Sequence, residues 1–174
     1  GLTELSDAAA ESLSKHKGRL LSLSGLTSLS DSAAESLSKH KGEIYLYGLT
    51  ELSDAAGHVA LAEKLSKLEV DCDLRGLTKL SDAAAEYLAA KQEGNLNLTG
   101  LTELSDSAAS SLSKHKGGYL SLRGLTELSD AAAESLSKHK GGDLYLDGLT
   151  QLSDSAAESL SKYTGYLQLG DSLE

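Results

Sequence analysis

Serine, aspartate and histidine, the residue types of a hydrolytic triad, recur at fixed spacing along this chain. Ser6 and Asp7 precede His16 by about ten residues, and the same spacing returns several times. About ten residues of helix span roughly 15 Å, whereas the members of a triad must touch through hydrogen bonds. Ser12 and His16 could touch, but no acidic residue is placed to orient the imidazole. Because residues repeated for folding are poor candidates for a unique site, the sequence predicts a non-catalytic protein.

The repeated histidines also raise the question of metal binding. His16 and His40 should be neighbours in space, as should His115 and His139. Packed helices hold their backbones about 8–10 Å apart, and no cysteine or carboxylate joins either pair as a zinc site would require. We therefore expect these histidines to be cations at helix C-termini, and we predict no metal and no cofactor. Cys72 stands at a position where most of the similar segments of this sequence have leucine, so it should be a buried thiol.

One phrase, Gly-Leu-Thr-x-Leu-Ser-Asp, dominates the chain. It begins at Gly1, Gly25, Gly48, Gly76, Gly100, Gly124 and Gly148. Successive copies are 24, 23, 28, 24, 24 and 24 residues apart, and such self-similarity is the signature of a repeat architecture. We predict one domain over residues 1–169, with seven units: 1–24, 25–47, 48–75, 76–99, 100–123, 124–147 and 148–169. Residues 170–174 form a tail that could derive from a vector.

Each unit is predicted to hold one helix and one strand. Ser6 is a natural N-cap, and Asp7 suits the positive end of a helix. Gly18 follows a basic stretch and could take the left-handed conformation that ends many helices. Residues 120–122 read Leu-Ser-Leu, and this period of two indicates a strand with one buried face.

Stacking of the units determines the predicted fold. One unit cannot bury its own apolar side, but stacked neighbours can, and a strand–helix–strand connection in one sheet is right-handed. Strands stack about 4.8 Å apart, whereas helices need about 8–10 Å, so the stack should bend. The sequence predicts an α/β fold: a right-handed β-α solenoid of seven repeats, with a parallel sheet on the concave side and helices on the convex side. Alanines at Ala33, Ala56 and Ala84 should let the helices approach closely.

The third unit, residues 48–75, breaks the pattern. Its helix carries about five extra residues at 57–61, and Val70 stands where other units have a closing glycine. Two interpretations stay open for this unit: a longer helix with a bulge, or a local contact site.

The pattern Leu-x-Leu-x-Gly-Leu-Thr-x-Leu, followed by an outer helix, resembles the leucine-rich repeat. With the helix phrase Ser-Asp-Ala-Ala-Ala-Glu-x-Leu-x-Lys-His-Lys-Gly, residues 1–169 look like a leucine-rich-repeat-like sequence of bacterial proteins. The resemblance implies binding on the strand face and names no ligand. The buried asparagine that usually follows the strand is missing. Threonines near its position should form a hydrogen-bonding ladder instead: Thr3, Thr27, Thr50, Thr78, Thr102, Thr126 and Thr150.

Residues beside the strand leucines should point outward. They differ from unit to unit, whereas the leucine positions of the repeat are nearly constant. Five of the seven tyrosines lie among them, and Tyr and Arg are favoured at binding hot spots, although Tyr also favours strands as such. The predicted binding surface consists of Tyr45, Tyr47, Asp73, Arg75, Asn97, Tyr119, Arg123, Tyr145, Asp147 and Tyr166. A protein-interaction scaffold is the first hypothesis. The alternatives are a carbohydrate-binding surface that stacks sugars on tyrosine rings, and an excised or designed repeat without a selected ligand.

Composition narrows the classes of partner. The formal net charge of −10 argues against nucleic acid, whose phosphates require an excess of Lys and Arg. No apolar run approaches the roughly 20 residues needed to span a bilayer, so we expect no membrane partner. The single cysteine of the chain does not indicate the cellular compartment of the protein. Neither end of the repeat carries a recognisable cap, which predicts end-to-end self-association.

Overall fold

The computed structural model describes residues 1–91 and 93–170. In this part of the chain seven helices alternate with short parallel strands. The helices are α1 (Asp7–Ser14), α2 (Asp31–Ser38), α3 (Ala56–Ser66), α4 (Asp82–Ala89), α5 (Asp106–Leu112), α6 (Asp130–Leu136) and α7 (Asp154–Leu160). The strands are β1 (Leu20–Ser22), β2 (Glu43–Tyr45), β3 (Glu51–Leu52), β4 (Cys72–Asp73), β5 (Lys79–Leu80), β6 (Leu96–Asn97), β7 (Leu120–Ser121), β8 (Leu144–Leu146) and β9 (Leu167–Leu169).

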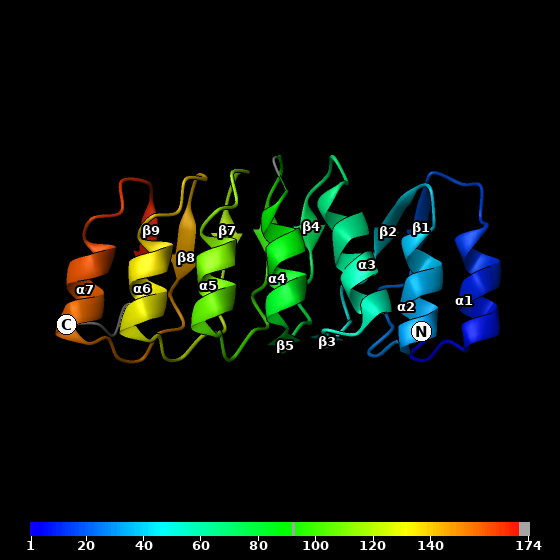
Figure 1. Cartoon of the computed structure of the whole chain (residues 1–174), viewed down its shortest axis with the longest axis horizontal. Helices are drawn as coiled ribbons and strands as arrows, with labels where there is room; N and C mark the ends of the chain where they lie inside the picture. The colour runs from blue at the N-terminus through cyan, green and yellow to red at the C-terminus, as the bar shows by residue number, and fades with distance from the viewer. Residues whose placement is uncertain (92, 171–174) are drawn as a thin grey trace.

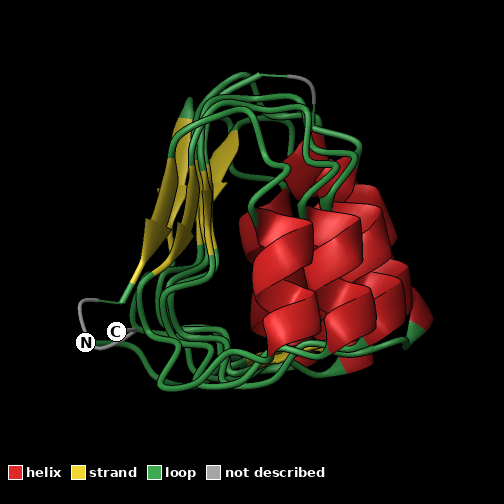
Figure 2. Cartoon of the chain, turned by 90° about the vertical axis from the view of Figure 1, so that its left-hand side faces the viewer, coloured by secondary structure: helices red, strands yellow, loops and turns green. Residues whose placement is uncertain are grey.

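The elements form two layers. The helices lie side by side in chain order (Figure 1), and the longer strands lie together on the opposite side (Figure 2). The strand pairing is parallel, and the register places each unit one step after the last, as in Leu96↔Leu120↔Leu144. The predicted repetitive α/β pattern, with a period of about 24 residues, is therefore confirmed. No helix in the described part is long and apolar enough to cross a bilayer.

The predicted single sheet is instead divided. Strands β1 and β2 form one pair, β4-β6-β7-β8-β9 form a second sheet, and β3 pairs with β5 beside the helix N-termini. The interruption between β2 and β4 coincides with a change of residue in the third unit. A Cβ at Gly42 would collide with the carbonyl oxygen of Arg19 in the preceding turn, so turns in this column stack only without side chains. Val70 occupies the corresponding position in the third unit.

Serine caps position the helices, as predicted. The side chains of Ser6, Ser30, Ser81, Ser105, Ser129 and Ser153 each accept a hydrogen bond from a backbone N–H in the first turn. The sequence reading missed a second role. The hydroxyl of Ser129 donates to Asp106 Oδ1 of the preceding helix at 2.5 Å, and Ser153 donates to Asp130 in the same way. Four of the six capping hydroxyls, those of Ser30, Ser105, Ser129 and Ser153, therefore also join neighbouring units.

Removing one of these hydroxyls tests its two roles together, the helix cap and the bond to the preceding unit. We expect Ser129→Ala to lower the free energy of unfolding by about 1–2 kcal/mol, because it deprives Ala132 N–H and Asp106 of a partner. Ser110→Ala, on the exposed side of α5, serves as the matched control and should change it by less than about 0.5 kcal/mol. Urea denaturation measures both, and equal losses would contradict the double role.

The turn after each strand is held by threonine and glycine. Thr50 Oγ1 donates to Thr27 O at 2.9 Å, and Thr78 Oγ1 donates to Thr50 O at 3.2 Å, so the predicted threonine ladder forms across these units.

The expectation of a left-handed glycine after each helix is wrong. Gly94, with φ of 76°, is the one glycine with positive φ among the described residues. Gly117 is required for a different reason, since a Cβ there would collide with Gly94 O.

Leucine and alanine columns fill the space between the layers, with Ile44 and Cys72 in two leucine positions. Burial raises the pKa of the Cys72 thiol to about 12, which agrees with the predicted inert core thiol. The prediction of closely packed alanines is confirmed at Ala33 and Ala84, which are buried. It is wrong at Ala56, which is exposed at the start of α3. The third unit instead has a longer helix of 11 residues, against 8 in α2, and fully buries Leu61.

Candidate interaction surface

The parallel register aligns the outward residues of successive strands into three columns. Tyr145, for example, lies between Ser121 and Gln168. Most of the predicted surface residues gather into two clusters within these columns. The N-terminal cluster consists of Tyr45, Tyr47, Asp73 and Arg75, and the C-terminal cluster consists of Tyr119, Arg123, Tyr145, Asp147 and Tyr166.

In the C-terminal cluster Arg123 lies over an aromatic ring. Its guanidinium carbon is 4.5 Å from the ring centroid of Tyr145, and its Nη1 donates to Asp147 Oδ2 at 3.1 Å. Tyr119 and Tyr166 meet Tyr145 edge-on, with centroid separations of 5.6 and 6.1 Å. These contacts fix the guanidinium and the rings before any partner arrives, so little side-chain entropy remains to be lost on binding.

Two polar groups of this cluster, the phenol of Tyr145 and the carboxylate of Asp147, differ in how their hydrogen bonds are satisfied. Desolvation and the hydrogen bond to Asp143 raise the pKa of Tyr145, so its phenol stays protonated and donates to Asp143 Oδ2 at 3.2 Å. Asp147 Oδ1 is buried and has no hydrogen-bond partner among the described residues. A buried acceptor without a partner is costly.

The N-terminal cluster repeats the same chemistry. The rings of Tyr45 and Tyr47 stack with centroids 5.2 Å apart, and the Arg75 guanidinium carbon lies 5.4 Å from the Tyr47 centroid. Arg75 Nε donates to Asp73 Oδ1 at 3.0 Å. Because Tyr47 follows β2 and Asp73 ends β4, this stack spans the place where the sheet is interrupted.

Asn97 belongs to neither cluster. Its Oδ1 accepts from Thr99 N at 3.1 Å, and Thr99 Oγ1 lies 2.9 Å from Ser121 Oγ, so a polar strip separates the two clusters. The prediction also left out residues that support the clusters. Asn95 accepts from Tyr119 N at 2.9 Å and donates to Asp71 at 3.1 Å. Its place in the same outward column as Tyr119 was the signal that could have identified it.

A second column lies between the layers, at the turn after each helix, and holds His16, His40, Leu68, Lys91, His115, His139 and Tyr163. His115 and His139 stack with centroids 5.8 Å apart, and Tyr163 stacks on His139 at 6.1 Å. Burial lowers the pKa of His115 to about 4 and also lowers that of His139. The expectation of helix-end cations is therefore wrong for His115 and His139, because burial favours the neutral form of both rings.

A serine and a histidine, two of the three residue types of a triad, meet at the start of α3, where the contact has a structural purpose. His58 Nδ1 lies 3.2 Å from Ser53 Oγ, but it also accepts the backbone N–H of Ser53 at 3.1 Å. His58 Nε2 lies 3.1 Å from Leu29 O, which requires the proton to be on Nε2. The imidazole thus anchors the start of α3, whose N-cap Ala55 has no side chain to offer. No group of three metal-binding side chains occurs among the described residues.

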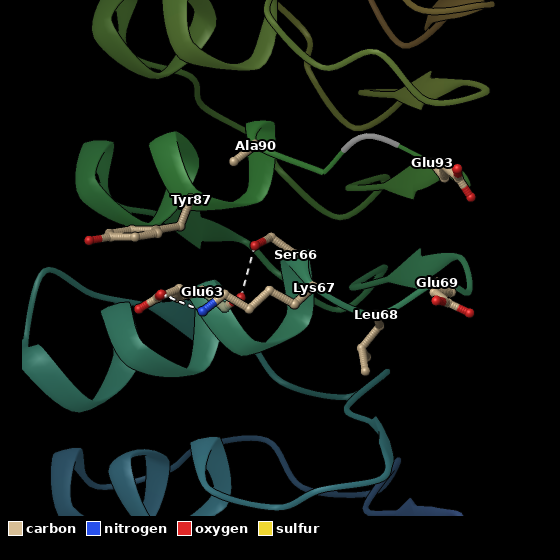
Figure 3. Close-up of a pocket in the computed structure, with 8 residues that line it drawn as sticks. All are labelled: Glu63, Ser66, Lys67, Leu68, Glu69, Tyr87, Ala90 and Glu93. Carbon is tan, nitrogen blue, oxygen red and sulfur yellow. Dashed lines mark hydrogen bonds and ion pairs between the residues drawn. The ribbon is translucent and has the colours of Figure 1, made fainter.

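A hollow of about 570 Å³ lies on the helix face between α3 and α4, beside the irregular unit (Figure 3). Tyr87 and Leu68 contribute apolar surface, and Tyr87 stands where most units have serine. Lys67 Nζ forms an ion pair with Glu63 at 2.6 Å at the Tyr87 end. The hollow thus arises from departures from the repeat, and none of the predicted surface residues lines it.

The sequence was also compared with known proteins. No protein-family model matches the chain, and no curated protein matches it.

Proposed function

We propose that the chain is a non-catalytic protein-interaction scaffold that binds its partner through the strand face. The observation that carries the proposal is the pair of preorganised Tyr–Arg–Asp clusters on an otherwise uniform repeat. In these clusters Arg123 lies over Tyr145 and Arg75 lies over Tyr47. Arginine and tyrosine are among the residue types that contribute most of the binding energy at protein interfaces. Variation confined to exposed columns lets a repeat protein change its partner without changing its core.

We further propose that the units form a right-handed solenoid of the leucine-rich-repeat type, with the strand face on the concave side. The parallel strands and the single row of helices support this arrangement. Strands about 4.8 Å apart facing helices about 8–10 Å apart would curve the stack towards the strands. A curved strand face would then surround a partner on more than one side.

The aromatic geometry favours a protein partner over a carbohydrate. Sugars bind tyrosine by stacking on an open ring face, but Arg123 covers one face of Tyr145 and Arg75 covers one face of Tyr47. Guanidinium groups held in this way still offer N–H donors to carboxylates and backbone carbonyls. The net charge of −10 supports the proposal that nucleic acid is not the partner.

Binding arrays can test this proposal. We would probe a displayed library of natural protein fragments and a glycan array with the chain, and then with the triple variant Tyr45→Ala/Tyr47→Ala/Tyr145→Ala. We expect selected protein fragments to bind the triple variant at least about tenfold more weakly, because two hot-spot clusters are lost. Tyr87→Ala on the helix face is the matched control and should leave the dissociation constant unchanged.

Two results would overturn the proposal. Fragments that bind the triple variant as tightly as the unchanged chain would show that the strand face is not the binding surface. Tyrosine-dependent signals on the glycan array, with none from protein fragments, would establish the carbohydrate alternative. Circular dichroism of each variant confirms that the fold is retained, which we expect because none of the three tyrosines belongs to the buried core.

A further inference from the structure

Large apolar side chains are exposed mainly at the two end faces of the stack. Leu2 and Leu20 of the first unit are 53% and 39% exposed, and Tyr166 of the seventh unit is 58% exposed. The equivalent leucine in the first column, Leu26, is completely buried because the first unit covers it. The end faces thus carry the same columns as the interior, but without a neighbouring unit in the described structure.

The contacts between units have a direction. The serine cap of a later unit donates to the aspartate of the earlier unit, as from Ser153 to Asp130. The threonine N–H of a later unit likewise donates to the earlier carbonyl, as from Thr150 to Thr126 at 3.1 Å. Strand amides donate in the opposite sense, as from Leu122 N to Tyr145 O at 2.9 Å.

The first and seventh units therefore carry complementary halves of one contact. The face of the first unit presents the hydroxyl of Ser6 and the N–H of Thr3. The face of the seventh unit presents the carboxylate of Asp154 and the carbonyl of Thr150. The same register would place β1 against β9, with Leu20 next to Tyr166, and would stack His16 on Tyr163 as His139 does at 6.1 Å.

We propose that a second copy of this chain docks head to tail, with the face of its first unit on the face of the seventh unit. The docked face is defined by α7, β9 and Tyr163, since residues 171–174 lie outside the described part. A head-to-tail contact does not close on itself, so it generates open chains of copies rather than a symmetric dimer. Because each copy carries a net charge of −10, association should strengthen as salt screens the repulsion.

Cross-linking between two variants that each add one surface cysteine tests both the contact and its direction. Ser22 and Gln168 occupy the same column, so docking would place them opposite each other on neighbouring strands. Such positions are about 5 Å apart, within the range that a disulfide bridges. Mixing Ser22→Cys with Gln168→Cys under mild oxidation should give the mixed dimer as the main product. The buried thiol of Cys72 should not compete.

The controls separate docking from random oxidation. Ser110→Cys on the helix face, mixed with Gln168→Cys, should give less than about a tenth of that product. Adding Leu20→Glu to the Ser22→Cys variant should abolish the mixed dimer, and it should also remove the concentration-dependent rise in sedimentation coefficient. Tyr87→Glu should do neither. The proposal is wrong if the mixed dimer does not form, if each variant cross-links mainly to itself, or if Leu20→Glu has no effect.

Discussion

Replacing Gly124 by alanine should lower the free energy of unfolding by about 3 kcal/mol or more. A Cβ at this position would lie 2.5 Å from the carbonyl oxygen of Leu101 and would also collide with that of Thr99. Both obstacles are backbone atoms of the preceding unit, which cannot move aside without opening the turn, so the overpacking penalty should reach the upper end of its usual range. Chemical denaturation followed by circular dichroism measures the loss.

The first unit supplies a matched control for this prediction. Gly1 begins the same Gly-Leu-Thr phrase, but a Cβ there meets nothing within 4 Å. Gly1→Ala should therefore change stability by less than about 0.5 kcal/mol. Because Gly124 does not have a positive φ, a large loss at Gly124 alone would identify close stacking of units as the cause. Similar effects of the two substitutions would contradict the packing described here.

Acid should destabilise the protein through the buried histidine column. Burial, with repulsion from His139 and Lys91, lowers the pKa of His115 from 6.5 to about 4 in the folded state. Below pH 6.5 the unfolded chain takes up a proton that the folded chain refuses, so stability falls as the pH drops towards 4. The difference between the two pKa values corresponds to about 3 kcal/mol. Above pH 6.5 this residue should contribute no pH dependence.

Substitutions within the same column isolate this effect from the titration of carboxylates. His115→Phe keeps a stacking ring but removes the proton-binding site, so its stability should fall less between pH 6.5 and 4 than that of the unchanged chain. His16→Phe, at the solvent-exposed end of the column, should leave the pH dependence nearly as it was. Urea denaturation at several pH values gives the comparison. Identical slopes for the chain and His115→Phe would show that His115 does not carry the effect.

The repeat made most of the fold predictable. Seven copies of one phrase revealed the period, and the serine at the helix start and the alternating leucines identified one helix and one strand in each unit. The same copying made the threonine ladder predictable, since Thr27 and Thr50 had to occupy equivalent places in adjacent turns. Local signals sufficed because every unit has nearly the same surroundings.

The errors arose where a residue's surroundings depend on the neighbouring unit. His115 follows a helix, which suggested a cation, but the next unit covers it. Gly117 suggested a left-handed turn, but its role is to let the next backbone approach. Val70 was recognised as a departure from the repeat, but the sequence did not show that it coincides with the interruption of the sheet between β2 and β4. A single unit read alone contains none of this information.

The candidate surface was predictable in composition but not in its grouping. The outward columns predicted the ten residues of the candidate surface, because alternation in a strand fixes which side chains face out. They did not show that Arg123 would lie on Tyr145, or that Asn97 would bond within a separate polar strip. Those contacts depend on the rotamers of long side chains and on the register between strands. The alignment of the repeats specifies neither of these.

Every surface and contact described above depends on one arrangement, in which the closing segment of each unit pairs in parallel with that of the next. Scalar couplings across hydrogen bonds, detected by NMR on the isotope-labelled chain, report such pairs directly. The structure predicts couplings from the amide nitrogen of Leu98 to the carbonyl carbon of Ser121, and from Leu122 to Tyr145, across N–O distances of 2.9 Å. Couplings from these amides to carbonyls four residues earlier, or none across either pair, would contradict it.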